Sequence, residues 1–344
     1  MSPPWVTLSR SGKRFAVDPG EAILDAALRQ EIWLPHACRG GTCGSCKATV
    51  VAGSVTYRES PPALTQPMVA RAEALLCCAK TADDITLDVA ELPVRPIGAA
   101  FRRPARVVAM ARPSRDVAMV TLKVPPNAAI RFRPGQYISL LGDDGRLHAF
   151  SIANAPRPDA TLQLHIGRIP NGRFTTHVHE RMSVGDIVRF EGPFGEFGFA
   201  DEPTPRPAIL LAGGTGIAPI KAMLEAAARE TVPREIHVYW GSRHKDGLYA
   251  LDDIAAIKAA SVTPVLSETM AEDLWRGRVG LVHRAVMADF PDLSRFDVYA
   301  CGSPGLIDTA FLDFTRDAGL PPECFFADAF HNAGTLPRVA SAAG

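Results

Sequence analysis

The sequence lacks the features that would place a protein in a membrane or on a nucleic acid. No run of about eighteen uninterrupted apolar residues occurs in the chain, so no membrane-spanning helix is predicted. Lys plus Arg and Asp plus Glu number 37 each, which leaves no basic excess for a nucleic acid or an anionic bilayer. Residues 1–5 have no charged segment before an apolar run, so no signal peptide is expected.

Familiar hydrolase and dehydrogenase patterns are missing too. The chain shows neither a catalytic triad nor a metal-hydrolase pattern. Its glycine-rich turn at 213–216 is not the G-x-G-x-x-G dinucleotide fingerprint. A length of 344 residues predicts two or three domains. Seven cysteines without a sign of an oxidising compartment fit a reducing environment, so we expect a soluble cytoplasmic protein.

Three of the cysteines lie in one short loop at C-x4-C-x2-C spacing. They are Cys38, Cys43 and Cys46, and Cys77 follows further along the chain. This is the ligand pattern of plant-type [2Fe–2S] clusters. Glycines between the ligands, such as Gly41, allow positive φ and let amide N–H groups point at the sulfurs. The sequence therefore predicts a [2Fe–2S] site with these four cysteines as ligands.

Two other uses of the cysteines stay open at this point. Structural zinc sites usually pair two C-x2-C knuckles, whereas here the second half is Cys77 beside Cys78. Disulfides need an oxidising compartment, which nothing in the sequence indicates. The apolar run 74–76 is expected to be buried, so it would place Cys77 on the inner side of the cluster. We therefore predict Cys77 as the fourth ligand, and Cys78 and Cys324 as small core residues.

Hydrophobic periodicity divides the chain into segments. Residues 4–93 follow the strand–strand–helix–loop–strand order of a β-grasp fold, and over this segment the chain resembles the plant-type ferredoxin domain; residues 94–104 form a Pro- and Arg-rich linker. Residues 105–202 are strand-rich and predict an antiparallel β-barrel. Residues 203–330 alternate buried strands with helices, which is typical of a doubly wound parallel sheet. A loose tail is expected over 331–344.

Within these segments we expect particular elements. The predicted strands are 5–8, 14–17, 48–51, 85–89, 105–109, 118–124, 136–140, 162–166, 207–212, 235–241, 262–266 and 297–302. The predicted helices open at 18–21 and cover 217–229 and 304–319. Trp240, at the end of an apolar strand, is expected in the core.

The glycine turn 213–216 leaves a predicted buried strand and enters a predicted helix. Glycines let the backbone approach a pyrophosphate, and the helix N-terminus favours its negative charge. The later loop 241–246 carries mixed charge. Arg243 and Lys245 could pair the 2′-phosphate of NADPH, whereas Asp246 could accept a hydrogen bond from the 2′-hydroxyl of NADH. The sequence leaves that choice open, and a plain surface loop is the alternative.

Five motifs follow one another in the order and at the intervals of the ferredoxin–NADP reductase superfamily. They are His148-x-Phe150-Ser151, Gly172-x-x-Thr175, Gly192-Pro193-x-Gly195, Gly213-Gly214-Thr215-Gly216-x-Ala218-Pro219 and Cys301-Gly302-x-Pro304. The chain resembles this superfamily over about residues 5–330. With its N-terminal cluster segment it is similar to the reductases of oxygenases and of deoxysugar dehydrases, which carry a [2Fe–2S] cluster, FAD and NADH or NADPH on one chain.

The resemblance implies a role for each motif. Ser151 would lie near the flavin ring, Cys301 near the nicotinamide during hydride transfer, and Phe330 over the flavin. The residues implied at the FAD are His148, Phe150, Ser151, Ile152, His165, Ile166, Arg168, Gly172, Arg173 and Thr175. Those implied at the nicotinamide nucleotide are Gly213, Gly214, Thr215, Gly216, Arg243, Cys301 and Gly302.

One position departs from the superfamily. Its usual R-x-Y-S motif reads His148-Ala149-Phe150-Ser151 here, so a guanidinium becomes an imidazole that is mostly neutral at pH 7. Weaker FAD retention is expected unless Arg146 or Arg173 substitutes. The resemblance also implies an electron acceptor, foremost the terminal component of an aromatic-ring oxygenase. A deoxysugar dehydrase partner, or a non-catalytic electron carrier or redox sensor, is the alternative; no nucleic-acid or membrane partner is expected.

Overall fold

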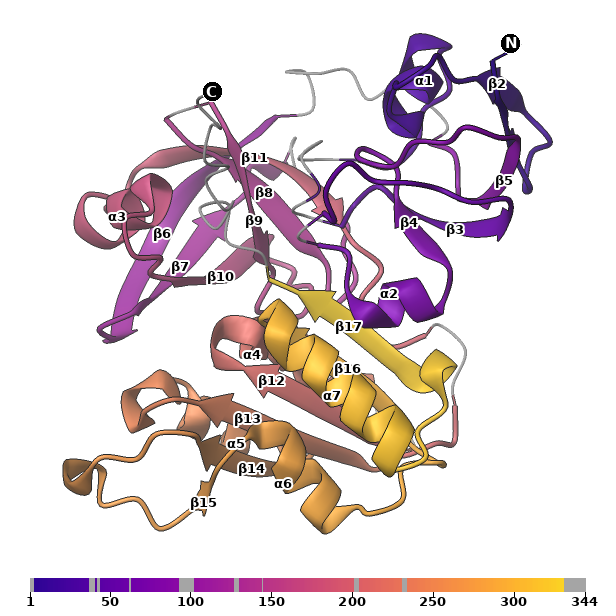
Figure 1. Cartoon of the computed structure of the whole chain (residues 1–344). Coiled ribbons are helices and arrows are strands. Elements are labelled where there is room, and N and C mark those ends of the chain that lie inside the picture. The colour runs from indigo at the N-terminus through magenta and orange to yellow at the C-terminus, as the bar shows by residue number, and fades with distance from the viewer. Residues whose placement is uncertain are drawn as a thin grey trace, which may run out of the picture.

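The computed structural model describes residues 3–36, 41, 44–61, 63–92, 102–126, 130–143, 145–200, 204–230 and 234–330. Over these residues the chain forms three bodies, each built on its own sheet, and Figure 1 shows the three meeting at a common centre. The sheets are mixed, antiparallel and parallel in that order. The predicted fold class is therefore confirmed: a β-grasp domain, an antiparallel barrel and a doubly wound parallel sheet.

The first body is a mixed sheet of five strands with a helix packed on it. Its elements are β1 (Trp5–Leu8), β2 (Arg14–Ala16), α1 (Ile23–Arg29), β3 (Lys47–Ala52), α2 (Gln66–Ala70), β4 (Glu73–Leu75) and β5 (Ile85–Asp88). Buried and exposed residues alternate along β1, so Val6 and Leu8 enter the core. The helix α1 begins at Ile23 rather than in the expected 18–21 stretch. There Glu21 accepts the backbone N–H of Asp18 in a closed turn.

The second body is an antiparallel barrel of six strands. Its elements are β6 (Arg103–Ser114), β7 (Val117–Lys123), β8 (Tyr137–Leu141), β9 (Leu147–Ser151), β10 (Thr161–Gly167), α3 (Arg173–Glu180) and β11 (Ile187–Phe194). Neighbours follow the order β10-β7-β6-β11-β8-β9, and a bridge between Ile152 and Leu164 joins the two ends. The sequence did not reveal β9 and β11 as strands, because few of their residues are buried and no apolar run marks them.

The barrel begins earlier than the expected strand 105–109. β6 starts at Arg103, inside the stretch predicted as a linker. The Arg102 guanidinium pairs with the Glu191 carboxylate at 2.9 Å, and Arg103 donates to the Gly192 carbonyl at 3.2 Å. Both side chains therefore fasten this strand to β11.

The third body is a parallel sheet of six strands with helices on both faces. Its elements are β12 (Ala208–Gly213), α4 (Ile217–Glu230), β13 (Ile236–Ser242), α5 (Leu251–Ala256), β14 (Ser261–Leu266), β15 (Arg278–Val279), α6 (Val282–Asp289), β16 (Asp297–Gly302), α7 (Pro304–Asp317) and β17 (Phe325–Ala329). Residues of α4 and α5 pack with Leu210 on one face, and those of α6 and α7 pack with Leu211 on the other. The strand order β15-β14-β13-β12-β16-β17 reverses at β12. Ligands bind such sheets at this switch point, outside the carboxyl ends of the strands.

The first body docks on the third through α2, a helix that the sequence did not predict. Figure 1 shows α2 beside α7 and β17. The Gln66 backbone N–H donates to the Asp308 carboxylate at 2.8 Å. Next to α2, Arg71 donates to the Pro322 carbonyl at 2.8 Å and lies over the Phe326 ring. This contact sets which side of the first body faces the other two.

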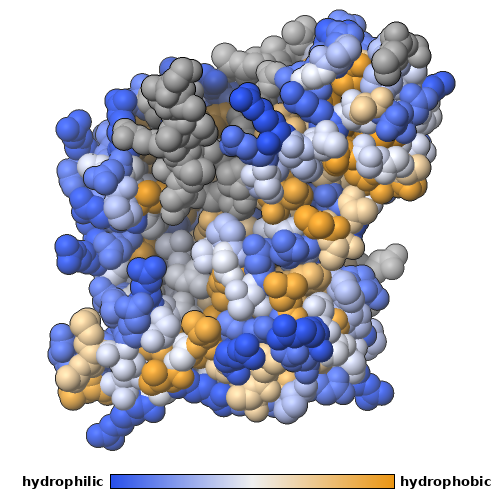
Figure 2. Space-filling view, in the orientation of Figure 1, coloured by the Kyte–Doolittle hydropathy of each residue, from blue (hydrophilic) through white to orange (hydrophobic). Residues whose placement is uncertain are grey.

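The surface agrees with the even composition of the chain. On the face drawn in Figure 2, hydrophobic and hydrophilic residues are interspersed rather than gathered into one apolar band. In the part of the chain that the structure describes, no helix is both long enough and apolar enough to cross a bilayer.

Candidate cofactor and nucleotide sites

Two of the predicted cluster ligands lie side by side. Cys46 precedes β3 and Cys77 follows β4, and these strands pair with each other, so Lys47 lies opposite Leu75. The Cys77 thiol is hydrogen-bonded to that of Cys46, and this bond, followed by burial, raises the pKa of Cys77. Cys38 and Cys43 lie outside the described residues. The Cys46–Cys77 contact fits a shared metal centre.

Cys78 is half-buried rather than a core residue. Its sulfur lies 3.6 Å from that of Cys77, on the same side of the body. A Cβ added to Gly41, whose φ is +71°, would lie 2.8 Å from the Cys78 sulfur. Only glycine fits there without a shift, which agrees with the predicted close wrapping of the cysteine loop. Cys324 is also half-buried, and burial raises the pKa of its thiol.

The predicted flavin motif gathers at the N-terminus of α3. The His148 ring stacks on Phe174 at 4.3 Å between centroids, and Phe150 packs on the same ring at 5.6 Å. Gly172 is the N-cap residue of α3, Arg173 is its first residue, and Thr175 receives the N–H of Ile169. An aromatic wall beside a helix N-terminus fits a flavin nucleotide with its pyrophosphate.

Not every residue implied at the FAD reaches a surface. The side chains of Ile152 and Ile166 are fully buried in the barrel core, so only their backbone could contact FAD, and that contact stays a prediction. His165 is also buried, and its Nδ1 lies 2.9 Å from the hydroxyl of Tyr249 in the third body. Burial, reinforced by the charge of Lys221, lowers the pKa of His165 to about 3, so the ring is neutral.

The residues implied in hydride transfer meet between the barrel and the parallel sheet. Cys301 on β16 lies opposite Asp328 on β17, with the thiol 4.0 Å from the carboxylate. The Ser151 hydroxyl is hydrogen-bonded to the same carboxylate, and burial raises the pKa of Asp328 to about 6. The Cys301 thiol is fully buried, which raises its pKa. The Phe330 N–H donates to the Gly302 carbonyl at 2.7 Å, so Phe330 follows directly after this group.

Asp328 was absent from the sequence prediction. A single acidic residue in an apolar strand gives no local signal of function. Only its pairing with Cys301 and its bond to Ser151 identify it.

The glycine turn lies where the sequence placed it, between β12 and α4. Gly214 has φ +53°, and a Cβ on Gly216 would lie 2.2 Å from the carbonyl oxygen of Cys301. The turn therefore packs backbone to backbone on the end of β16. The Trp240 indole N–H donates to the Gly214 carbonyl at 2.9 Å. Trp240 is fully buried as predicted, and it also holds the turn in place.

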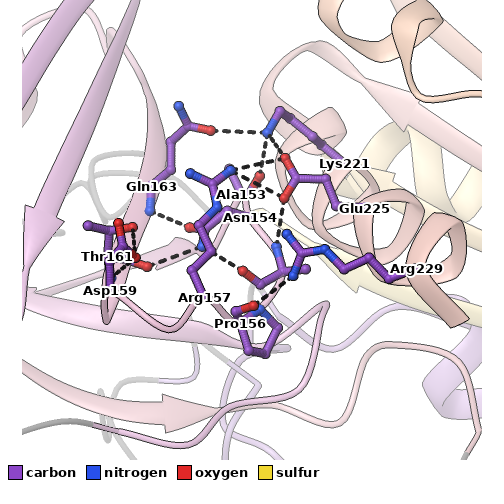
Figure 3. A network of polar contacts seen from close by, with 11 residues as sticks. Ala153, Asn154, Pro156, Arg157, Asp159, Thr161, Gln163, Lys221, Glu225 and Arg229 are labelled. Carbon is purple, nitrogen blue, oxygen red and sulfur yellow. Dashed lines mark hydrogen bonds and ion pairs between the residues drawn. The ribbon is translucent and has the colours of Figure 1, made fainter.

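A polar network fixes the parallel-sheet body against the barrel, and Figure 3 shows its members converging from α4 and from the β9–β10 connection. Lys221 is almost fully buried, and its ammonium donates to the Ala153 carbonyl and the Gln163 side chain, both at 3.1 Å. It also pairs with Glu225, whose carboxylate accepts the Ala155 N–H at 3.1 Å. Burial alone would raise the pKa of Glu225, but Lys221 outweighs it and the pKa is lowered.

A cavity of about 980 Å³ lies where the three bodies meet. Ser45 and Lys47 line it from the cysteine side, Tyr137 and Phe194 from the barrel, and Asp328 from β17. The Tyr137 hydroxyl contacts the Ser45 hydroxyl, and its ring packs on Phe194. The cavity thus extends from Gly44 and Ser45 of the cysteine loop to Asp328, the hydrogen-bond partner of Ser151, and its volume leaves room for a planar ring system.

These observations define a class of protein: an oxidoreductase with an iron–sulfur domain, a flavin domain and a nicotinamide-nucleotide domain on one chain. Comparison with known families agrees. Residues 6–82 match the 2Fe-2S iron-sulfur cluster binding domain, 104–199 the oxidoreductase FAD-binding domain, and 210–311 the oxidoreductase NAD-binding domain.

Whole-length relatives show the same layout. The CDP-6-deoxy-L-threo-D-glycero-4-hexulose-3-dehydrase reductase of Yersinia pseudotuberculosis is 38% identical, over 94% of this chain and 98% of that protein. Reductase component 1 of terephthalate 1,2-dioxygenase from Comamonas sp. is 34% identical, over 93% and 95%. The solved ferredoxin reductase of carbazole 1,9a-dioxygenase is 26% identical with a TM-score of 0.68, over 95% and 98%.

The chain belongs to the ferredoxin–NADP reductase superfamily, in the group with an N-terminal [2Fe–2S] ferredoxin domain. Its cofactors are the [2Fe–2S] cluster, FAD and a nicotinamide nucleotide. It is an oxidoreductase that passes electrons from NAD(P)H through FAD to the cluster and on to a redox enzyme.

Proposed function

We propose that the acceptor is the terminal component of an oxygenase, most directly one that acts on aromatic rings. The observation that supports this proposal is the cavity that the three bodies share. It extends from Ser45 and Lys47, beside the predicted cluster ligands, to Asp328 of the parallel-sheet body, so we expect electrons to leave through the first body. Release of single electrons from the first body is suited to a protein as the electron acceptor. The likeness to the terephthalate and carbazole dioxygenase reductases supports an oxygenase in that role.

We propose the following roles at the donor side. Gly213–Gly216 and the start of α4 bind the nucleotide pyrophosphate, with Trp240 fixing the turn. His148, Phe150 and Arg173 hold the FAD at the start of α3, where the histidine stacks on Phe174 instead of offering a guanidinium fork. FAD held there would supply a hydride acceptor that can release electrons one at a time.

The group Ser151, Cys301 and Asp328 orients the reacting rings in this proposal. With a pKa of about 6, the Asp328 carboxyl gains or loses a proton close to neutral pH, and the Ser151 hydroxyl links it to the flavin side. Cys301 packs directly behind the carboxylate and excludes water there. Phe330, which follows β17 in the chain, covers the flavin face in the absence of nucleotide.

A deoxysugar dehydrase is the second candidate acceptor. One observation favours it: the Yersinia dehydrase reductase is 38% identical to this chain, against 34% for the terephthalate reductase component. The three-body layout serves both acceptors equally. The surface around the cluster would make the choice, and Lys47, Arg58 and Glu59 are candidates among the described residues.

Two coupled assays decide between the acceptors. The purified protein with NAD(P)H is combined with a terminal aromatic-ring dioxygenase and its aromatic substrate, or with a CDP-hexulose dehydrase and its sugar nucleotide. Product formation in the first assay alone supports the proposal, and product in the second alone replaces it with the dehydrase role.

An anaerobic titration tests the relay itself. NADH and NADPH are added separately while absorbance follows the flavin and low-temperature EPR follows the cluster. We expect flavin bleaching with a reduced-cluster signal, lost in Cys77→Ser and kept in Cys78→Ser. A cluster signal obtained with dithionite but with neither nucleotide would contradict the relay.

A further inference from the structure

Tyr137 lies where the barrel meets the cysteine side of the first body. It is the first residue of β8, whose neighbours in the sheet are β9 and β11. Ser151 is its direct partner on β9, and Phe194 is its partner on β11. Residues paired in this way across antiparallel strands present their side chains on one face of the sheet. Tyr137 therefore shares a face with Ser151, the residue implied beside the flavin ring.

The ring of Tyr137 is held tightly in the barrel. The residue is only 7% exposed, and its ring packs on that of Phe194 at 5.7 Å between centroids. A Cβ on Gly195, whose φ is +91°, would lie 3.1 Å from two carbons of the same ring. Glycine at that position thus leaves the space that the ring needs. Because the hydroxyl oxygen is a rigid extension of the ring, this packing also fixes where the hydroxyl lies.

The Tyr137 hydroxyl crosses from the barrel to the first body. It is hydrogen-bonded to the hydroxyl of Ser45, and either oxygen can donate. Ser45 lies in the turn 44–47, which a backbone hydrogen bond of 3.1 Å closes. The next residue, Cys46, is a predicted cluster ligand and is bonded to the Cys77 thiol. The hydroxyl pair therefore ties the barrel to the residue directly before a predicted ligand.

This contact is well placed to set the gap between two redox centres. Tyr137 and Ser45 both line the cavity that the three bodies share. Electron transfer slows steeply as the gap between two centres widens, so their separation must be held closely. A hydrogen bond shielded from water holds such a geometry better than an exposed one. The contacts of α2 fasten the first body to the parallel sheet, whereas this one fastens the cysteine side to the barrel.

We propose that the Tyr137 hydroxyl is a positioning group for electron transfer from the flavin to the cluster, because through Ser45 it holds the cysteine turn 44–47 against the barrel. Tyr137 itself gains and loses neither electrons nor protons. The inference rests on the relay from FAD to the cluster and is independent of which acceptor lies beyond it.

Stopped-flow absorbance of the holoprotein with NADH or NADPH tests the proposal, since flavin bleaching and cluster reduction are separate phases. Tyr137→Phe keeps the ring against Phe194 and removes only the hydroxyl. We expect cluster reduction to slow about tenfold or more, while flavin bleaching stays within about twofold. Ser45→Ala should slow the same phase. The double variant should be no slower than the slower single variant, because both changes remove one bond.

The matched control removes a different tyrosine hydroxyl. Tyr239 is also buried, and its hydroxyl donates to the Asp289 carboxylate at 2.6 Å within the parallel-sheet body. Tyr239→Phe should leave both phases within about twofold of the parent protein. All variants are compared at full flavin and cluster content, so that a slower phase does not reflect missing cofactor.

Two measurements give readouts apart from turnover. The first is the reduction potential of the cluster, which hydrogen bonds to its sulfurs would tune. A hydroxyl that only positions the turn leaves this potential unchanged in Tyr137→Phe. The second is hydrogen exchange of the oxidised holoprotein. Amides of the turn 44–47 should exchange faster in Tyr137→Phe, whereas those of α1 in the same body should not.

Three outcomes would overturn the proposal. An unchanged cluster phase in Tyr137→Phe would show that the hydroxyl does not hold the transfer geometry. Slowing of both phases by the same factor would assign Tyr137 to the flavin site. A shifted cluster potential that accounts for the slower phase would make the hydroxyl a tuning group. Absence of flavin bleaching in the parent protein would instead contradict the relay itself, so the two failures are distinguishable.

Discussion

At the scale of single residues, the proposed chemistry depends on two small groups. Ser151, Cys301 and Asp328 come from three strands and two bodies, yet Ser151 and Cys301 each contact the Asp328 carboxylate. Gly214 and Gly216 differ in why they must be glycine. Gly214 needs a positive φ in open space, and Gly216 has no room for a Cβ.

The first prediction uses this difference. In Gly216→Ala the new Cβ would meet the Cys301 carbonyl, a backbone group that cannot move without shifting β16. We expect KM for the nucleotide to rise more than tenfold, with a lower melting temperature. Gly214→Ala should cost only the strain of a left-handed residue, about 1–2 kcal/mol. Ferricyanide kinetics and thermal melting compare the two; equal effects would contradict the close-packing argument.

The second prediction concerns pH. The pKa of Asp328 is about 6 in the folded protein against an ordinary value of 3.8, so the folded state binds the proton more tightly than the unfolded state. Stability from this group is then present at low pH and is lost as pH rises toward about 6. Asp328→Asn removes the titration. Its stability advantage over the parent should grow from pH 5 to 6 and be constant above pH 7.

Thermal melting of both holoproteins across this range checks the prediction. Ser303→Ala, which alters a helix cap on the same body, serves as the control because its effect should not depend on pH. A pH-independent difference between Asp328→Asn and the parent would mean that Asp328 keeps an ordinary pKa.

At the scale of elements, the short helix α2 has a larger role than its length suggests. It gave no sequence signal, since a helix of five residues shows little more than one turn of periodicity. Its position against α7 and β17 nevertheless orients the cluster domain. Arg71 is the main anchor, because its guanidinium reaches both the Pro322 carbonyl and the Phe326 ring.

The third prediction follows from that anchor. Arg71→Ala should leave flavin reduction by nucleotide unchanged and slow the later reduction of the cluster severalfold, because the docked arrangement is less populated. Stopped-flow absorbance resolves the two phases. Arg58→Ala, an exposed arginine of the same domain, is the matched control. An unchanged cluster phase in Arg71→Ala would show that this contact does not govern transfer between the domains.

At the scale of the whole molecule, the sites exist because three separately built bodies are held in one arrangement. The group Ser151, Cys301 and Asp328 spans the barrel and the parallel sheet, and the large cavity spans all three bodies. The network around Lys221 and Glu225 is the buried part of that framework. Their side chains are 7% and 15% exposed.

The fourth prediction tests the framework. Lys221→Met leaves the largely buried Glu225 carboxylate with the more exposed Arg157 as its remaining cationic partner, so the loss should stay below the about 3–5 kcal/mol of a fully broken buried pair. We expect flavin release on heating to begin about 5 °C lower or more. Adding Glu225→Gln to this variant should restore part of the loss, since the buried carboxylate no longer carries a charge that Lys221 would have balanced. Lys258→Met, at an exposed position of the same domain, should change little.

The sequence by itself determined the three folds, the cofactors and the positions of the main motifs. Those features depend on local information: apolar periodicity, glycine at turns, and cysteine spacing, as in the Cys46 loop and the 213–216 turn. Local patterns could not reveal the roles of the half-exposed β9, the short α2 and the isolated Asp328. Each of these roles depends on contacts with residues far away in the sequence.

Only the tertiary structure decided which distant residues share a site. It placed Cys77 against Cys46, buried the side chains of Ile152 and Ile166 in the barrel core, and joined Ser151 to Asp328 across two bodies. The physical reason is that docking between bodies depends on a few buried contacts, such as Lys221 with Glu225, whose partners lie on separate elements. Such pairings depend on contacts between residues that are far apart in the sequence, which local sequence patterns do not reveal.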